Sequence, residues 1–336
     1  MHFTRSRKSV AGLAVGVAAL GLGLVGPAAP LATGMVAAPP AGDGCITAPA
    51  NARQMGGGDG TDPNSVSLAE TKAMEAEFQA GIQNLQRQAA RRGVRHPSYK
   101  GIHLPKKIEI DTYVHVITRA DGSGDVTNKM IRDQIKVMND GYAGKASPTA
   151  AATPFRFKLK AVDRTPNDDW YDWSDPDVDP SDDTEAKTAL HRGTFSDLNI
   201  YIAGLGDNLL GYAYYPDEVP LWQDGLVVLN DSLPGGAAAP YNEGDTATHE
   251  IGHWLFLLHT FENGCTFPGD EVPDTAYQLD GDNIFECDEA LDTCAQPGTD
   301  PVHNYMSYGD DPCLDEFTRG QALRMTLAWL VFRAHR

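Results

Sequence analysis

The pattern of hydrophobic and polar residues predicts strands mixed with helices through the middle of the chain. Apolar residues alternate with other residues along 108–116 and 155–162, which are predicted strands. Shorter apolar segments predict three more strands: 198–203, 209–215 and 226–230. Helical spacing of apolar residues after Thr127 predicts a capped helix, and a short helix is predicted near 185–191. The acidic stretch 163–183 has no period and is predicted to be a loop, so the mixture indicates an α/β layer.

Another helix is predicted before these elements. Ser67 and Glu70 have the spacing of a capping box. The apolar residues that follow lie roughly along one helical face: Leu68, Met74, Phe78, Ile82 and Leu85. The run ends at a basic cluster before Gly93. Two interpretations stay open, because this helix is either packed on the folded domain or part of a removable pro-segment with the basic cluster as its processing region.

The N-terminus has the order of features that is typical of a secretory signal. Arg5, Arg7 and Lys8 precede an apolar run over 10–25, and small residues and prolines follow. The alternative is a membrane anchor, but the run is shorter than the roughly 20 residues that a bilayer span requires. We therefore predict a signal peptide over 1–33 (its end approximate), a leader or pro-segment over 34–100, and a main domain over 101–336.

Charge and cysteine content agree with export. A net charge of −19 over 336 residues disfavours nucleic acid as a partner, because a phosphate backbone would be repelled. It fits a secreted protein that uses carboxylates to hold calcium. Four of the five cysteines lie between 265 and 313, in a turn-rich region before a last helix over 318–332, and none form a C-x-x-C pair. Two disulfides are expected, with three pairings open and Cys45 left over.

The strongest chemical signal is an H-E-x-x-H motif with a third histidine six residues later. Two residues four apart on a helix lie on one face, so His249 and His253 are placed to bind one zinc ion. Glu250 lies beside them as the expected general base. His259 would face away on a continuous helix, so the helix must break before it. Three histidines leave one zinc position open for water, which is the catalytic arrangement.

A second element lies downstream of the histidines. The segment 304–308 reads Asn-Tyr-Met-Ser-Tyr, which has the form of a methionine-containing turn beneath a zinc site. Met306 is expected to form a hydrophobic floor under the ligands. Tyr308 is expected to donate a hydrogen bond to a developing oxyanion, and the alternative is a packed surface tyrosine.

Together these motifs resemble the metzincin zinc peptidases, and the details resemble the pappalysin branch in its secreted bacterial form. The resemblance covers about 107–336 and is densest from Gly244 onward. The matching stretches are 244–250, 259–261, 264–265, 269–275, 304–308, Asp311, Cys313 and 317–321.

The resemblance implies an α+β fold in two parts. An upper subdomain (101–259) would hold a mixed, mostly parallel twisted sheet with a backing helix and the active-site helix. An irregular lower subdomain (260–336) would carry the Met-turn and the disulfides Cys265–Cys294 and Cys287–Cys313. The resemblance also implies calcium, with Asp270 and Asp274 as ligands, and a zymogen in which Cys45 occupies the zinc.

The implied activity is that of a secreted, monomeric endopeptidase that acts on proteins or peptides and, once its signal is removed, has no membrane or nucleic-acid partner. Glu250 would activate a zinc-bound water, Tyr308 would stabilise the oxyanion, and the substrate would lie along the predicted edge strand 209–215. Carboxylates of Asp310 and Asp311 would either favour basic substrates or, as we prefer, cap a loop or hold calcium.

One residue departs from the family signature. Phe256 stands where the signature has a glycine, at the point where the active-site helix must end in a left-handed conformation. A catalytically weakened or inactive zinc-binding protein is therefore the alternative to the enzyme. A calcium-dependent binding module is a further alternative, but it leaves the three histidines unexplained.

Overall fold

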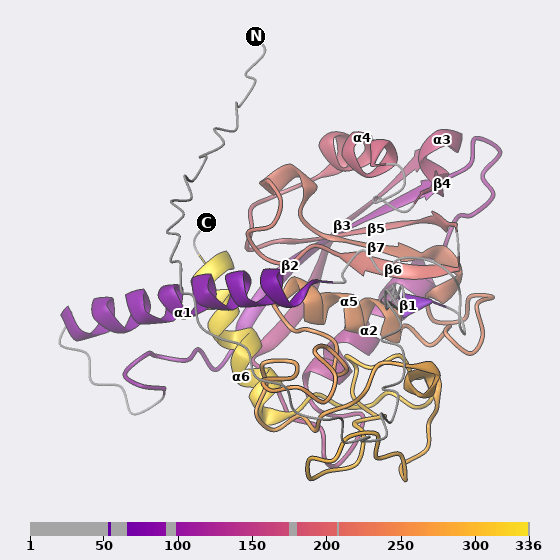
Figure 1. Cartoon of the computed structure of the whole chain (residues 1–336). Coiled ribbons are helices and arrows are strands. Elements are labelled where there is room, and N and C mark those ends of the chain that lie inside the picture. The colour runs from indigo at the N-terminus through magenta and orange to yellow at the C-terminus, as the bar shows by residue number, and fades with distance from the viewer. Residues whose placement is uncertain (1–52, 55–65, 92–98, 175–179, 207, 335–336) are drawn as a thin grey trace, which may run out of the picture. The chain divides into compact units, whose positions relative to one another are not determined.

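The computed structural model describes residues 53–54, 66–91, 99–174, 180–206 and 208–334 (Figure 1). The predicted signal peptide, Cys45 and the basic cluster at 91–93, apart from Arg91, lie outside these residues. Within them, no helix is long and apolar enough to cross a membrane.

A twisted sheet with the strand order β1-β6-β7-β5-β2-β3 forms the centre of the fold. Its strands are β1 (Arg53–Gln54), β2 (Ile108–Thr118), β3 (Phe155–Pro166), β5 (Leu198–Leu205), β6 (Leu209–Ala213) and β7 (Leu226–Leu229), and a short β4 (Asp172–Trp173) pairs with the end of β5. Strands β2, β3, β5 and β7 are parallel, whereas β6 is antiparallel to β7. Strand β1 is antiparallel to β6 and covers its outer edge.

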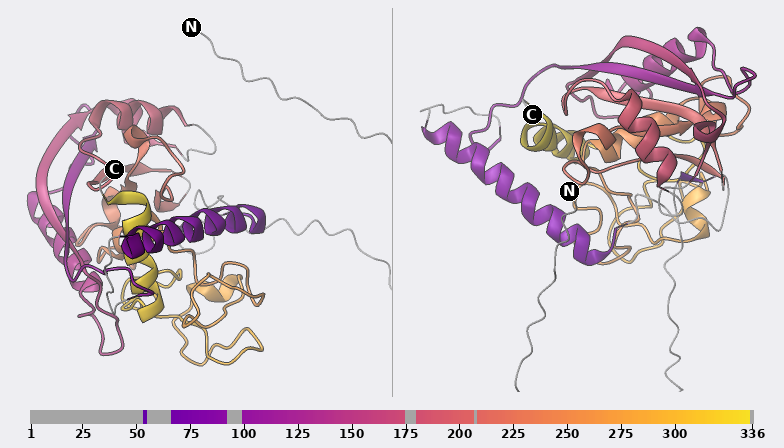
Figure 2. Two further views of the ribbon diagram at one scale, coloured as in Figure 1. Left: turned by 90° about the vertical axis from the view of Figure 1, so that its left-hand side faces the viewer. Right: turned by 90° about the horizontal axis from the view of Figure 1, so that it is seen from above.

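Helices cover both faces of the sheet (Figures 1 and 2). On one face lie α2 (Asn128–Tyr142) and α5 (Asp245–Trp254), and on the other lie α3 (Asp168–Tyr171) and α4 (Ser181–Leu190). Alternate side chains of β2 make the first face apolar. Ile108, Ile110 and Val116 are buried there with apolar residues of α2 and α5. This arrangement confirms the mixed, mostly parallel sheet with a backing helix and an active-site helix.

Two helices cross each other beside this body. Helix α1 (Leu68–Arg91) lies against α6 (Arg319–Ala328) and the π-helical turn η4 (Trp329–Arg333), as all three views show. The predicted capping box is present, since the Glu70 carboxylate accepts from the Ser67 backbone N–H at 2.9 Å. Phe78 and Ile82 are buried as predicted, but Leu68 is 45% exposed and lies off the packed face.

Several predicted boundaries were wrong. The stretch 163–183 is not a plain loop, because β3 extends into it and α3 and β4 follow. The helix near 185–191 begins at Ser181, since Asp182 and Asp183 occupy its first turn. Strand β6 ends at Ala213, two residues before its predicted end. The last helix begins one residue after its cap, Thr318, and closes with a π turn.

The lower half of the domain, residues 260–336, contains little regular structure before α6. Short 3-10 turns occur in both halves: η1 (Leu221–Gln223), η2 (Asn230–Ser232) and η3 (Asp282–Phe285). Disulfides join Cys265 to Cys294 and Cys287 to Cys313, which is the pairing that the family resemblance implies.

Candidate metal centre

Helix α5 is fixed at both ends, and this places the first two histidines. At its start, one carboxylate oxygen of Asp311 accepts from the backbone N–H of Glu243 at 2.7 Å and of Gly244 at 3.0 Å. At its end, Arg333 donates from Nε to the Trp254 carbonyl at 2.9 Å, and its guanidinium lies 3.6 Å from the centre of the Trp254 ring. The helix that carries His249 and His253 is therefore held from the lower half and from the C-terminal turn.

The helix ends directly after Trp254, as the third histidine requires. The Phe256 N–H donates to the His253 carbonyl at 2.8 Å, and the Leu257 N–H donates to the Gly252 carbonyl at 2.9 Å. Phe256 itself has a φ of 75°, which is the left-handed conformation. This is the hydrogen-bond pattern of a Schellman turn, and it reverses the chain so that His259 returns to the other two ligands.

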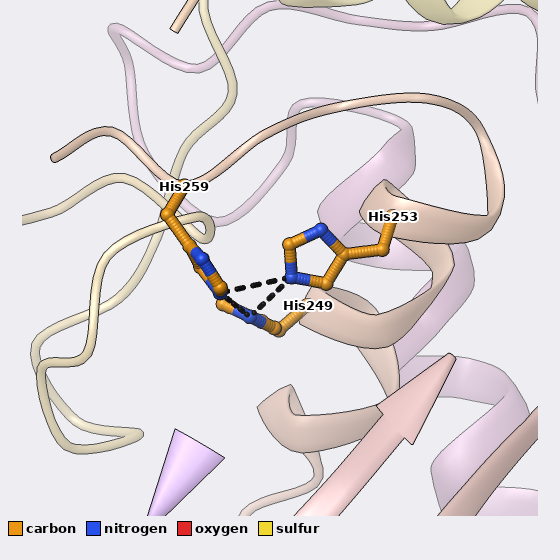
Figure 3. Close-up of side chains that lie close together, drawn as sticks. All are labelled: His249, His253 and His259. Carbon is orange, nitrogen blue, oxygen red and sulfur yellow. Dashed lines mark hydrogen bonds between the residues drawn. The ribbon is translucent and has the colours of Figure 1, made fainter. Parts of the chain in front are cut away.

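The three histidine rings converge on one point (Figure 3). Nε2 of His253 lies 3.0 Å from Nε2 of His249 and 3.0 Å from Nε2 of His259, and the remaining pair is 3.3 Å apart. Ligands at the zinc–nitrogen distance of about 2.05 Å in a tetrahedron lie about 3.3 Å from each other. The spacing of these nitrogens therefore fits a single tetrahedral ion.

Hydrogen bonds on the far side of the rings set the tautomers. Nδ1 of His249 lies 2.6 Å from the Tyr305 carbonyl, and Nδ1 of His253 lies 2.8 Å from the Leu257 carbonyl. Since a carbonyl only accepts, each Nδ1 carries the proton and each Nε2 presents its lone pair inward. Burial lowers the pKa of His253 to about 4 and that of His259 well below its usual value. Both rings are neutral at pH 7, as metal ligands must be.

The segment that carries Met306 packs against helix α5. The Met306 side chain packs so closely against Gly252 of α5 that a Cβ there would collide with its sulfur. The turn is held by Asn304 and Gln321, whose side-chain amides exchange two hydrogen bonds of 2.8 and 2.9 Å. Gln321 also completes the capping box of α6. Sequence reasoning did not find Gly252 or Gln321, because their roles depend on packing between distant segments.

Of the two predicted catalytic side chains, Tyr308 contacts the histidine centre directly, and Glu250 lies on α5 next to His249 in the sequence. The Tyr308 phenol oxygen is 3.1 Å from Nε2 of His259, and the side chain is fully buried. Glu250 is also fully buried, on the side of α5 that faces β6. A Cβ at Gly211, in the middle of β6, would come within 3.2 Å of Glu250 Cγ and 2.8 Å of the Val227 carbonyl. Gly211 therefore allows the edge strand and the active-site helix to approach closely.

Comparison with known proteins agrees with this geometry. A model of the peptidase M43 family, described as pregnancy-associated plasma protein-A, matches residues 179–329. An extracellular metalloprotease of Neurospora crassa is 42% identical over 237 residues, covering 68% of this chain and 77% of that protein. Extracellular metalloprotease 1 of Coccidioides posadasii is 38% identical over 238 residues, covering 69% and 80%.

The chain belongs to the pappalysin family of metallopeptidases. A solved structure of mature mirolysin from Tannerella forsythia, in complex with a cleaved peptide, has 28% sequence identity and a TM-score of 0.57. That likeness covers 68% of this chain and 96% of mirolysin. The sequence relatives named above are fungal, so the bacterial form of the resemblance stays a prediction.

Within this pappalysin, Phe256 is accommodated where the family signature has glycine. A left-handed conformation costs a residue with a side chain about 1–2 kcal/mol. The Phe256 side chain is 2% exposed and packs against the rings of Phe78 and Phe332, with centroids 5.1 and 5.3 Å away. Full burial of a phenylalanine contributes about 1.5–3 kcal/mol, and each ring pair adds about 0.5–1.5 kcal/mol. The packing therefore offsets the strain.

The acidic residues of the lower half have separate roles. Asp311 caps α5 as described, in agreement with our preferred interpretation, and its carboxylate is committed to backbone N–H groups. Asp274 accepts from Thr318 Oγ1 and from the Gly320 N–H, both at 2.8 Å, and so caps α6. Asp270 is buried, and apart from the neighbouring Thr275 hydroxyl its Oδ2 atom has no hydrogen-bond partner within the described part of the chain. Burial raises the pKa of Asp270 to about 7.

Proposed function

We propose that this pappalysin is a secreted zinc endopeptidase in which Glu250 is the general base and Tyr308 stabilises the oxyanion. The observation that carries the proposal is the convergence of three buried histidine Nε2 atoms 3.0–3.3 Å apart. When bound by His249, His253 and His259, zinc lowers the pKa of a water molecule and polarises the substrate carbonyl. The donor set, its burial and the tautomers of His249 and His253 fit that ion.

The protein's own side chains supply the proton transfers and the charge stabilisation. Glu250 takes a proton from the attacking water and passes it to the leaving amine. Tyr308 donates from its phenol to the oxyanion that develops on the carbonyl oxygen. Both groups are buried, so the hydrogen bonds form in a low-dielectric environment where they are strongest. Peptide hydrolysis is consistent with mirolysin, whose structure was solved with a cleaved peptide.

We propose that the substrate pairs with the outer edge of β6. In this chain the backbone of Arg53–Gln54 already occupies that edge, with Arg53 opposite Gly211 and Gln54 opposite Leu209 in an antiparallel register. An extended peptide adds to a free strand edge through the same backbone hydrogen bonds. The segment before α1 therefore competes with substrate, which supports a zymogen whose leader must leave the edge. Secretion is supported by the signal-like N-terminus and by relatives named extracellular metalloproteases.

Calcium is proposed as a second, structural ion. The Asp270 carboxylate is buried beside the Thr275 hydroxyl, and apart from each other neither Oδ2 of Asp270 nor Oγ1 of Thr275 has a hydrogen-bond partner in the described structure. Both residues line one cavity of ≈ 280 Å³, together with Thr260 beside the last histidine ligand. Calcium binds oxygen ligands of this kind. Asp270 is the residue we retain as its ligand, whereas the Asp274 carboxylate caps α6.

The test is Glu250→Ala in the secreted, processed chain. We expect turnover of casein to fall by at least about 10³-fold while one zinc ion per chain is retained, because the carboxylate moves protons and does not hold the metal. Glu243→Ala, at a glutamate before α5, is the matched control and is expected to cleave normally. A Glu250→Ala protein that cleaves like wild type would overturn the assignment. Wild-type protein that binds zinc but never cleaves would favour the inactive alternative.

A further inference from the structure

Helix α1 is joined to the zinc-binding turn through one arginine. Arg324 of α6 donates from Nε to the Phe256 carbonyl at 2.9 Å and forms an ion pair from Nη1 with Glu75 of α1 at 2.9 Å. Its guanidinium lies 4.7 Å from the Phe256 ring centre and 5.1 Å from that of Phe78. Arg324 is only 7% exposed. The backbone of the left-handed residue is thus held by a buried cation whose charge α1 balances.

Ring packing makes a second connection between the same elements. The Phe78 ring of α1 meets the Phe256 ring edge to face, with an interplanar angle of 60°. On its other side Phe256 lies against Tyr215, whose ring contacts the ligand His253 with centroids 5.5 Å apart. Phe256 stands midway between His253 and His259 in the sequence. Contacts from α1 therefore reach the residue whose left-handed conformation returns His259 to the other two histidines.

The fit between α1 and the domain extends along the helix. Gly81 of α1 lies so close to Val331 that a Cβ there would collide with its side chain. Phe78 and Ile82 are 2% and 4% exposed. Together with Thr71, these residues form the buried face by which the helix is docked on the domain. By contrast, the edge of β6 is covered by a segment that ends before α1 begins, so clearing the edge does not require removal of the helix.

We propose that α1 stays on the mature enzyme as a clamp on the turn between two zinc ligands, with Phe256, Phe78, Glu75 and Arg324 as positioning residues. The maturation cut then falls between Gln54 and Leu68, which separates the segment on β6 from the retained helix. Phe256 makes this contact with α1 possible, because the glycine of the family signature has no side chain for Phe78 to contact. This inference rests on the proposed zinc site.

The first measurement is the composition of the active, secreted enzyme. Intact-mass analysis and N-terminal sequencing are expected to give a chain that starts between Met55 and Leu68 and contains 68–91. Active enzyme that starts after Arg91, with no peptide covering 68–91 in the purified sample, overturns the proposal. Neither result depends on how fast the enzyme turns over.

The second measurement is the rate of zinc release to a coloured chelator. Glu75→Gln removes the carboxylate that forms the ion pair with Arg324, and we expect release to become about threefold to tenfold faster, the range expected for coupling through a packed network. Glu77→Gln, an exposed glutamate on the same helix, is the matched control and is expected to stay within about twofold. Equal release rates for both variants overturn the clamp. If the wild-type protein binds no zinc, the proposed function is overturned instead of the clamp.

A double-mutant cycle isolates the role of Phe256. Phe78→Ala is expected to speed zinc release about threefold to tenfold in the wild-type background. In the Phe256→Gly background it is expected to change release by less than about twofold, because the ring that Phe78 contacts is gone and glycine adopts the left-handed conformation without support. Additive effects of the two substitutions would show that Phe78 acts elsewhere and would overturn the proposed coupling. Circular dichroism of each variant verifies that the helices remain folded.

Discussion

Different interactions stabilise the upper and the lower half of the catalytic domain. In the upper half, 101–259, apolar side chains of the strands are buried against α2 and α5. In the lower half, the chain before α6 is held by two disulfides and by carboxylates that accept from backbone N–H groups, as Asp300 does from Thr293 at 3.0 Å. Hydrophobic burial in the sheet layers dominates the first half, whereas the second half adds covalent and polar connections to its smaller set of buried apolar side chains.

The proposed zinc site combines a contribution from each half. His249 and His253 come from a helix that the sheet positions, whereas Met306 and Tyr308 come from the irregular half below. The two histidines on α5 and the tyrosine proposed to stabilise the oxyanion therefore depend on different sources of stability. Disturbing the lower half should therefore change the chemistry before it unfolds the sheet.

Removal of a disulfide is the largest expected disturbance. Replacing Cys265 and Cys294 together by serine opens a loop with a sequence separation of 29, and we expect a loss of about 2–4 kcal/mol. Hydrogen exchange measured by mass spectrometry should become faster in 260–313 and remain slow in β2 and β5. Uniformly faster exchange in both halves would show that the two halves unfold as one unit and would contradict the comparison.

Tyr308→Phe tests whether the lower half contributes a hydrogen-bond donor to the reaction. Removing one oxyanion donor is expected to lower kcat about 10²-fold with little change in KM or in zinc content, because the phenol acts on charge that develops in the transition state. Tyr277→Phe, the same change at another tyrosine of the lower half, is the control and should leave kcat unchanged. A Tyr308→Phe enzyme with normal kcat would leave this tyrosine a packing role only.

The contrast between the halves also explains how much of the molecule could be predicted from sequence. Alternation of apolar residues located β2 and β3, because a sheet buries every second side chain. The H-E-x-x-H spacing located two histidines, because helix geometry is fixed. Met306 and Tyr308 were predicted from a short motif downstream of the histidines, since no period marks an irregular chain.

Other features lay beyond any local pattern. The capping of α5 by Asp311 joins residues 67 positions apart, and no sequence pattern near Gly244 indicates this contact. Phe256 read as a weakness because its partner, Phe78, lies 178 positions earlier in a helix whose place on the domain was open. The opposite error occurred at Leu68, which has the right spacing for the packed face but lies at the helix start and remains exposed.

Asp311→Ala tests the connection between the halves at a smaller scale. The carboxylate accepts N–H groups at the start of α5, and loss of such a cap costs about 1–2 kcal/mol. We expect a lower thermal midpoint and weaker zinc binding, because the helix that carries two ligands loses its anchor. Asp310→Ala, at the neighbouring residue, is the matched control. Identical midpoints for the two variants would show that the cap contributes nothing to stability.

The smallest expected effect concerns Asp270 and the proposed calcium. Burial raises the pKa of this carboxyl to about 7, so without an ion the folded protein holds the proton more tightly than the unfolded chain, whose ordinary value is near 4. The contribution of this group to stability therefore falls as pH rises from about 4 to 7 and stays lost above pH 7. Calcium needs the ionised carboxylate and should reverse the loss.

At pH 8, free calcium at five times its dissociation constant should stabilise the protein by about 1 kcal/mol, with a smaller gain at pH 5.5. Asp270→Asn should remove both the calcium response and this part of the pH dependence in thermal unfolding. If calcium stabilises the variant as much as wild type, the ion is bound elsewhere, and the irregular half is held at this point by its disulfides and caps alone.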